Sequence, residues 1–301
     1  MSGSERLIDA ESTLKYLLGD PIKKIKFDDY VTSLLKQAIG DIRSDKFRND
    51  LPDIREFGIQ TGLTQYETVV RDLLFAAILT GRWGQSDQTF SLENVISRFA
   101  EARWPSSGLT NDWLAFQWYP ICLVIYAAGI AALASRNYPF LAKILQAKII
   151  SRANKHVLEP VIVRVLDEMG ETDRYFKFLP EYEPSYAPQS EYIFTLLHPL
   201  FDRTLFLGND YERLFDQFEM ILALVHADAT QRDDGRFWTK PGRFGYMARR
   251  PGGPFSAFVS EMEKAGDAMP LLKAGLFSSS TERFREVSKG CLEFFRALPS
   301  Y

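Results

Sequence analysis

The segment 231–256 concentrates side chains that could bind an anionic ligand. It is rich in Gly, Pro and Arg, and aromatic residues are interleaved with its cations. Guanidinium groups bind phosphate in a bidentate manner, and aromatic rings stack on bases. The candidate contact residues for a protein, nucleotide or nucleic-acid partner are Arg236, Trp238, Lys240, Arg243, Phe244, Arg249 and Arg250. The same composition fits a loop that folds back over the core and pairs its arginines with the acidic stretch 181–191.

A second candidate site lies on the helix predicted from Asp210. Asp216, Glu219 and His226 recur on the face opposite its apolar residues. Carboxylate and imidazole groups at this spacing could hold a divalent metal for a nuclease or a nucleotide hydrolase. An ordinary solvated helix face has the same composition. The chain has no glycine-rich phosphate loop, HExxH, CxxC or serine elbow, so the sequence predicts no cofactor.

These candidate sites must be positioned by helices, and the most unusual helical stretch is 113–135, which has no charged residue. Its length would allow it to span a membrane, which is the basis of one alternative, a membrane-associated effector. Gln117 and Pro120 divide its most apolar part, and no second such stretch accompanies it. We therefore expect either a short helix followed by a second one near Trp118 or one kinked helix, buried in the centre of the protein.

Helical periodicity dominates the remaining sequence. Apolar residues recur at intervals of three and four through most segments, and no strand pattern is evident. The predicted fold is mainly α, with ten or more helices around the buried stretch 113–135. Thr64 and Glu67 predict a capping box that opens a helix over 65–81. Another helix is expected from Pro139 through Ile150, and an aromatic helix over 191–207 is expected to be interrupted at Pro199.

The segment 180–190, PEYEPSYAPQS, is the best candidate for a boundary. It would separate a helical core domain, 1–180, from a helical subdomain, 190–301, although one continuous domain is also compatible with the pattern.

The net charge is only −3, so the whole chain exerts no general attraction on nucleic acid or anionic lipid. Two isolated cysteines and an N-terminal segment without an apolar signal core predict a cytoplasmic protein.

Several of these segments resemble a helical region of bacterial multidomain proteins linked to phage defence. The resemblance covers roughly residues 65–250 and rests on WYP at 118–120, LVIYAAGIAALA at 123–134, RNY at 136–138, LFDQFE at 214–219, LALV at 222–225, and Trp238 followed by PGRF at 241–244. In those proteins the region follows sirtuin-like or Toll/interleukin-receptor-like effector domains. The resemblance implies a helical sensor or scaffold module and not a catalyst. We expect such a module to contact a protein partner or effector domain, and an oligomer is compatible with the sequence.

Overall fold

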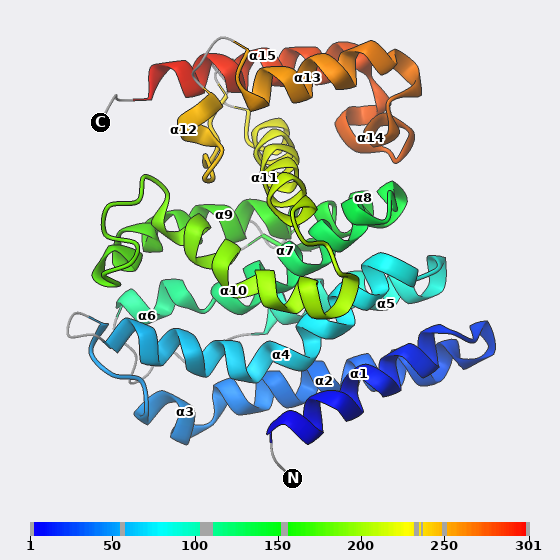
Figure 1. Ribbon diagram of the computed structural model, residues 1–301, viewed down its shortest axis with the longest axis vertical. Coiled ribbons are helices and arrows are strands. Elements are labelled where there is room, and N and C mark those ends of the chain that lie inside the picture. The colour runs from blue at the N-terminus through cyan, green and yellow to red at the C-terminus, as the bar shows by residue number, and fades with distance from the viewer. Residues whose placement is uncertain are drawn as a thin grey trace.

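The structure, a computed structural model, describes residues 3–54, 58–102, 111–151, 156–231, 235, 237–248 and 252–298. Within these residues eleven α-helices are seven residues or longer, and the only sheet has two strands. The mainly α fold with ten or more helices is therefore confirmed. The helices stack in successive layers from the N-terminus to the C-terminus (Figure 1).

The N-terminal layers contain α1 Gly3–Leu18, α2 Lys24–Arg43, α3 Asp45–Asn49, α4 Ile59–Trp83 and α5 Ser86–Glu101. The central layer contains α6 Asn111–Phe116, α7 Tyr119–Ala134 and α8 Tyr138–Leu145, followed by the strands β1 Lys148–Ile150 and β2 Leu158–Pro160. The chain continues with α9 Val161–Thr172, α10 Pro188–Leu205 and α11 Asp210–Ala229, of which α9 and α11 lie above α7 in Figure 1. The chain ends in a C-terminal layer of α12 Gly245–Ala248, α13 Pro254–Ala265, α14 Pro270–Lys273 and α15 Thr281–Ala297.

Amphipathic periodicity accounts for the outer helices. The buried residues of α2 follow one another at intervals of three or four, which places them on a single face: Phe27, Val31, Leu35, Ala38 and Ile42. Helix α15 is built in the same way, and Ser280 caps it by accepting a hydrogen bond from the amide of Arg283. Each of these helices packs one apolar stripe on the core and leaves its charged face exposed.

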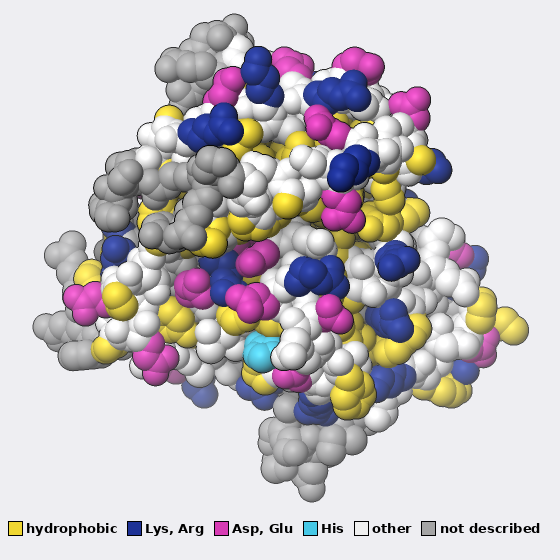
Figure 2. Space-filling model, turned by 45° about the horizontal axis from the view of Figure 1, so that its top comes forward, with side chains coloured by type: hydrophobic (Ala, Val, Ile, Leu, Met, Phe, Trp, Pro, Cys, Tyr) yellow, Lys and Arg dark blue, Asp and Glu magenta, His cyan; other side chains and the backbone are white. Residues whose placement is uncertain are grey.

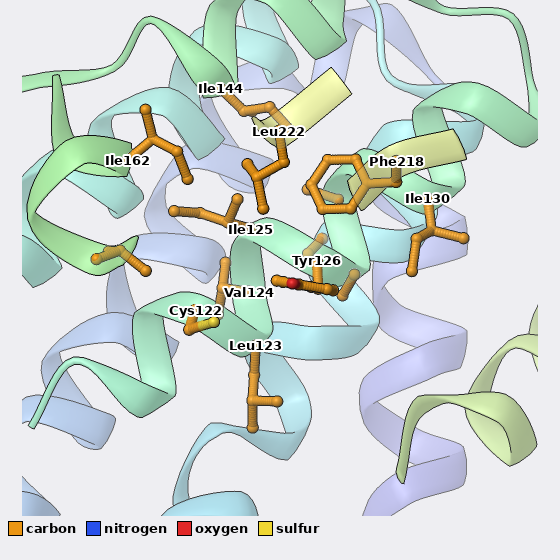
Figure 3. Packing of buried hydrophobic residues seen from close by; sticks show 14 of the residues in the cluster. Cys122, Leu123, Val124, Ile125, Tyr126, Ile130, Ile144, Ile162, Phe218 and Leu222 are labelled. Atoms are coloured by element: carbon orange, nitrogen blue, oxygen red, sulfur yellow. The ribbon is translucent and has the colours of Figure 1, made fainter. Parts of the chain in front are cut away.

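Helix α7 is buried on all sides, as predicted. Every residue from Tyr119 to Leu133 is buried, and its side chains point outward in all directions into neighbouring helices (Figure 3). Small residues allow these neighbours to approach closely. A Cβ on Gly129 would lie 1.9 Å from the ring of Phe218, and one on Gly81 would lie 2.7 Å from the Cβ of Ala131. Of the two arrangements expected for this stretch, the structure has two separate helices and not one kinked helix, because α6 ends at Phe116 and Pro120 lies in the first turn of α7.

The stretch Trp113–Ala134 is long and apolar enough to cross a membrane, with a mean hydropathy of 1.6. In this fold, however, 89% of its most apolar window is buried inside the protein. Its apolar surface is thus covered by neighbouring helices, as in the core helix of a helical domain.

Three local predictions were wrong. The helix from Pro139 does not continue through Ile150, because residues 148–150 form β1, which pairs antiparallel with β2. Only Ile149 of this strand faces inward, so the short alternation of a strand was masked by the apolar pattern of the preceding helix. The aromatic helix is not interrupted at Pro199, since buried Leu197 and Phe201 anchor α10 on both sides of the proline.

The third wrong prediction concerns the start of α4. Thr64 lies inside the helix, which begins at Ile59, and its hydroxyl donates to the carbonyl of Gln60. Glu67 is not a capping residue either, because it accepts hydrogen bonds from Tyr119 and Tyr192.

The hydrophobic core is shared by the two units predicted on either side of 180–190. One cluster of buried residues runs from Leu14 to Phe295 and includes residues of α7, α10, α11 and α15. The ring of Tyr182, inside the predicted boundary, packs against that of Tyr192 with centroids 5.4 Å apart. Both sides of the segment 180–190 therefore contribute to the same packed interior.

Candidate functional site

Residues 237–244, here called the strap, connect α11 with the C-terminal layer and lie across α9, α10 and α11. Thr239 is buried, and its hydroxyl donates a hydrogen bond of 2.9 Å to the carbonyl of Ala223 in α11. At its end, Phe244 packs against Phe255 and Phe295 of the C-terminal layer, and these two rings also contact each other. The strap therefore joins the C-terminal layer to the centre of the molecule.

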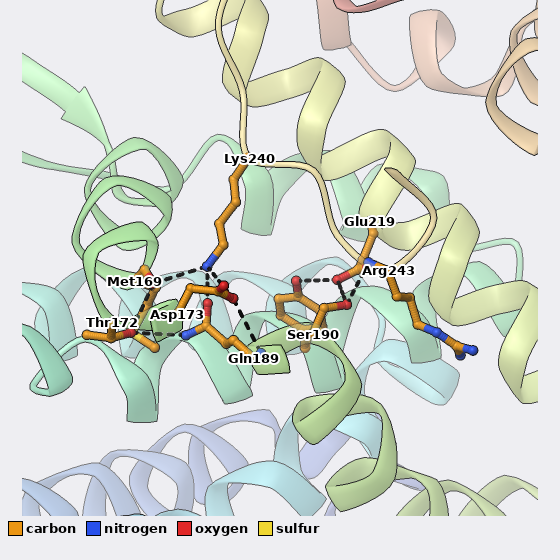
Figure 4. Close-up of polar contacts among 9 residues, drawn as sticks. Met169, Thr172, Asp173, Gln189, Ser190, Glu219, Lys240 and Arg243 are labelled. Atoms are coloured by element: carbon orange, nitrogen blue, oxygen red, sulfur yellow. Dashed lines mark hydrogen bonds and ion pairs between the residues drawn. The ribbon is translucent and has the colours of Figure 1, made fainter. Parts of the chain in front are cut away.

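The carboxylate of Glu219 lies under the strap and is 2% exposed. Its Oε1 accepts hydrogen bonds from the hydroxyls of Tyr126, at 2.9 Å, and Ser190, at 2.6 Å. Its Oε2 accepts one from the backbone amide of Arg243 at 3.0 Å, and the same amide also lies 2.9 Å from the hydroxyl oxygen of Ser190 (Figure 4). Glu219 thus links α7, α10, α11 and the strap through one buried group.

Gly242 is required for this arrangement. A Cβ at this position would lie 2.0 Å from Oε2 of Glu219, far inside van der Waals contact. Only a residue without a side chain lets the backbone approach the carboxylate closely enough for the next amide to donate to it.

Lys240 enters the protein beside Glu219 (Figure 4). Its Nζ donates to the carbonyl of Met169 at 3.0 Å and to the side-chain oxygen of Gln189. The nearest carboxylate oxygen of Asp173 is 3.9 Å away. Burial lowers the pKa of Lys240, and Asp173 opposes that change. The lysine is thus held mainly by neutral oxygens, with one weak ionic contact.

Arg243 follows Gly242 in the strap, and its side chain is 16% exposed. Its guanidinium group lies 3.9 Å from the ring centroid of Phe194. Three carboxylates surround it, with nitrogen–oxygen distances of 2.8 Å to Glu212, 3.3 Å to Glu191 and 3.8 Å to Asp216. Burial raises the pKa of Asp216 to about 6, although the charge of Arg243 acts to lower it.

A cavity of about 20 Å³ separates the groups beneath the strap. Its lining combines polar and apolar side chains: Cys122, Tyr126, Leu166, Met169, Gln189, Ser190, Glu219, Leu222, Lys240, Pro241 and Gly242. A space of this size admits about one water molecule. Burial raises the pKa of Glu219 to about 7, against the hydrogen bonds from Ser190 and Tyr126. The chemistry available here is proton uptake at one carboxylate, and there is no room for an organic substrate.

The structure does not bring the three predicted metal ligands together. Glu219 is bound under the strap, Asp216 is beside Arg243, and Nε2 of His226 lies 3.3 Å from Oδ1 of Asp167. Among the described residues, no three His, Cys, Asp or Glu side chains are grouped as a metal site. The alternative of a solvated helix face is wrong for Glu219 and His226, because both are buried.

The predicted partner-contact residues divide into two groups. In the described part of the loop, Lys240, Arg243 and Phe244 are engaged within the molecule, and Trp238 is half-buried with its ring against His226. The pairing of Arg243 with Glu191 is the fold-back arrangement considered from the sequence. The other predicted contacts lie outside the described residues: Arg236, Arg249 and Arg250.

Sequence reasoning missed the hydroxyl groups that bind the buried carboxylates. A second such group is Glu67 of α4, whose Oε1 accepts from the hydroxyls of Tyr119, at 2.8 Å, and Tyr192, at 2.7 Å. Burial raises the pKa of Glu67 as well. The available signal was that Tyr119 and Tyr126 lie seven positions apart on an otherwise apolar helix, so their hydroxyls leave the same face and need buried partners.

Comparison of the chain with protein-family models, with curated proteins and with solved structures finds no significant match in any of the three.

Proposed function

We propose that this protein is a non-catalytic helical scaffold that recognises a protein partner. The observation that carries the proposal is that the polar groups beneath the strap are bonded to one another around a cavity that admits about one water molecule. Catalytic pockets that take a small organic substrate usually have volumes of several hundred Å³. The buried charges here therefore act as a joint between helical layers.

A protein partner is favoured over nucleic acid by the distribution of charge. Arg243 is surrounded by three carboxylates, so its charge is already neutralised within the chain. The face seen in Figure 2 carries basic and acidic side chains interspersed with apolar ones, without a continuous basic area. Binding to a phosphate backbone depends on such an area. The resemblance to helical regions of phage-defence proteins supports antiviral defence as the setting of this scaffold.

Metal and substrate titrations test the proposal against the enzyme alternative. Calorimetry of the purified chain with Mn²⁺ and Mg²⁺ should show no saturable site at Asp216, Glu219 and His226. Incubation with nucleotides and single-stranded DNA or RNA should release no product above a protein-free control. Saturable metal binding or hydrolysis that is lost in both Asp216→Asn and Glu219→Gln would contradict the proposal and establish a hydrolase.

A second arm tests recognition directly. The tagged chain is captured from cells of its source together with bound proteins, and each candidate is then purified and its binding measured by biolayer interferometry. A variant with Arg249→Glu and Arg250→Glu carries the sequence-predicted contact residues in reversed charge, and Arg213→Glu on the exposed start of α11 is its matched control. A partner of the kind proposed binds the control as it binds the native chain. If all three proteins bind the partner equally, the contact lies outside the basic loop. If none of the purified candidates forms a stoichiometric complex with the chain, the scaffold role is contradicted.

A further inference from the structure

Four large apolar side chains are exposed where the first helices turn. Ile22 is 90% exposed, Ile25 69%, Tyr16 64% and Phe90 57%. We call these four residues the apolar end. Single exposed apolar residues are common, but a contiguous group of this kind usually marks an interaction site.

The contacts between the turns show that these residues share one end of the molecule. The side chain of Asp20 caps the 3-10 helix Pro21–Lys23 by accepting a hydrogen bond from the backbone amide of Ile22, and α2 begins directly after this short helix. The ammonium group of Lys23 lies 3.6 Å from the ring centroid of Tyr16. Lys24 pairs with Asp87 at 3.1 Å, and Asp87 is one helical turn before Phe90 on α5. The α1–α2 turn projects at the right-hand edge of Figure 1.

The size of the apolar end corresponds to the centre of a protein interface. Aromatic side chains present about 150–250 Å² each when fully accessible and isoleucines somewhat less, so these four leave roughly 400–500 Å² of accessible surface. A standard interface covers about 800 Å² on each partner, of which about 60% is apolar. The apolar end therefore supplies the apolar share of one standard interface, and the surrounding polar residues supply the rest.

The charges around the apolar end favour a second copy of the same chain. Its basic residues are paired within the chain: Lys15 with Glu11 at 2.7 Å, Lys23 with Asp20 at 3.0 Å, and Lys24 with Asp87 at 3.1 Å. These pairs cancel, so a polyanion or an anionic lipid surface meets no net positive charge.

The next exposed charges along α2 have both signs, which is what self-association requires. Lys26, Asp28 and Asp29 are exposed in its first turns and form no ion pair with another described residue. In a twofold-symmetric pair the same patch meets itself, so a cation of one copy can face an anion of the other. A patch with one sign of charge would repel its own copy.

We propose that two copies of this chain associate symmetrically through the apolar end. Ile22 and Ile25 of each copy pack against the apolar end of the other, and Lys26 of each copy faces the acidic pair of the other. The inference does not depend on the proposed function, since a scaffold and an enzyme could both form this dimer.

Sedimentation velocity on the full chain, from roughly 1 to 100 µM, covers the range in which an interface of ordinary affinity is half-occupied. The native chain should pass from monomer to dimer within this range. Ile22→Glu with Ile25→Glu should weaken association at least about tenfold, which corresponds to about 1.4 kcal/mol. Phe206→Glu is the matched control, because Phe206 is also highly exposed but lies after α10. This control should dimerise like the native chain.

A charge-exchange experiment keeps the proposal testable if the isoleucine variants unfold. Lys26→Glu and the double variant Asp28→Lys, Asp29→Lys should each associate weakly alone and associate again when mixed. A native chain that remains monomeric over the whole range would overturn the inference. So would a folded Ile22→Glu, Ile25→Glu variant that dimerises normally, or charge variants that fail to complement one another.

Discussion

The buried carboxylate of Glu219 should make the stability of this protein fall as pH rises. Burial raises the pKa of Glu219 to about 7 from the 4.5 of an unburied glutamate. The folded state therefore binds the proton more tightly than the unfolded state. The stabilising contribution of the protonated group is complete below the unfolded pKa and is lost as pH rises through the folded value.

The magnitude follows from the difference between the two pKa values. Each pKa unit corresponds to about 1.4 kcal/mol, so the free energy of unfolding should lose roughly 3 kcal/mol across this window. An unfolding entropy of about 2.1 cal/mol/K per residue converts this loss, for a chain of 301 residues, into a Tm lower by roughly 5 °C.

The assay compares the native chain with Glu219→Gln by calorimetry at about pH 5 and about pH 8, on either side of the expected titration. Glutamine has nearly the same shape but does not titrate, so the variant should lose roughly 5 °C less between the two pH values than the native chain. Asp216→Asn is the control, because the pKa of Asp216 is also raised, to about 6, and contributes a change of the same sign. This control should keep most of the pH dependence that belongs to Glu219, because burial raises the pKa of Glu219 more than the charge of Asp216 does.

Two results would refute this reasoning. If Glu219→Gln and the native chain lose the same Tm between the two pH values, Glu219 does not titrate in this range. If the native chain gains stability with rising pH relative to the variant, the hydrogen bonds to the carboxylate outweigh its burial.

Two further predictions concern packing. Gly242→Ala should lower the free energy of unfolding by about 2–4 kcal/mol, because its Cβ would displace the strap from Glu219. Gly40→Ala is the control at an exposed position with open space on α2, and it should raise the free energy of unfolding by about 0.5–1 kcal/mol. Urea unfolding measures both changes, and equal effects would contradict the tight approach of the strap to Glu219. Cys122 and Cys291 should resist iodoacetamide in the folded protein and react in urea, because both are buried and burial raises the pKa of each thiol to about 12. Mass spectrometry measures the labelling, and rapid labelling of the folded protein would show that one of the two thiols is accessible.

Local patterns in the sequence determined the helices and the central position of one of them. Phe27, Val31 and Leu35 are spaced four residues apart and fall on one face of a helix, so α2 could be predicted without knowledge of its neighbours. The uncharged run around Pro120 likewise predicted a buried helix, but it left open whether the chain breaks or only kinks near the proline. These features depend on residues within a few helical turns of one another, and the periodic spacing of apolar residues reveals relationships over that distance along the chain.

The character of the candidate site was decided by tertiary contacts. Asp216, Glu219 and His226 recur at helical spacing and are indistinguishable in pattern from a solvated face. Glu219 becomes buried because the strap, about twenty residues later, crosses α11, and because the hydroxyl of Tyr126 reaches it from a helix about ninety residues earlier. Burial then raises its pKa, and the backbone amide of Arg243 donates a hydrogen bond to it. Desolvation depends on everything that surrounds a group, so no local pattern could predict it.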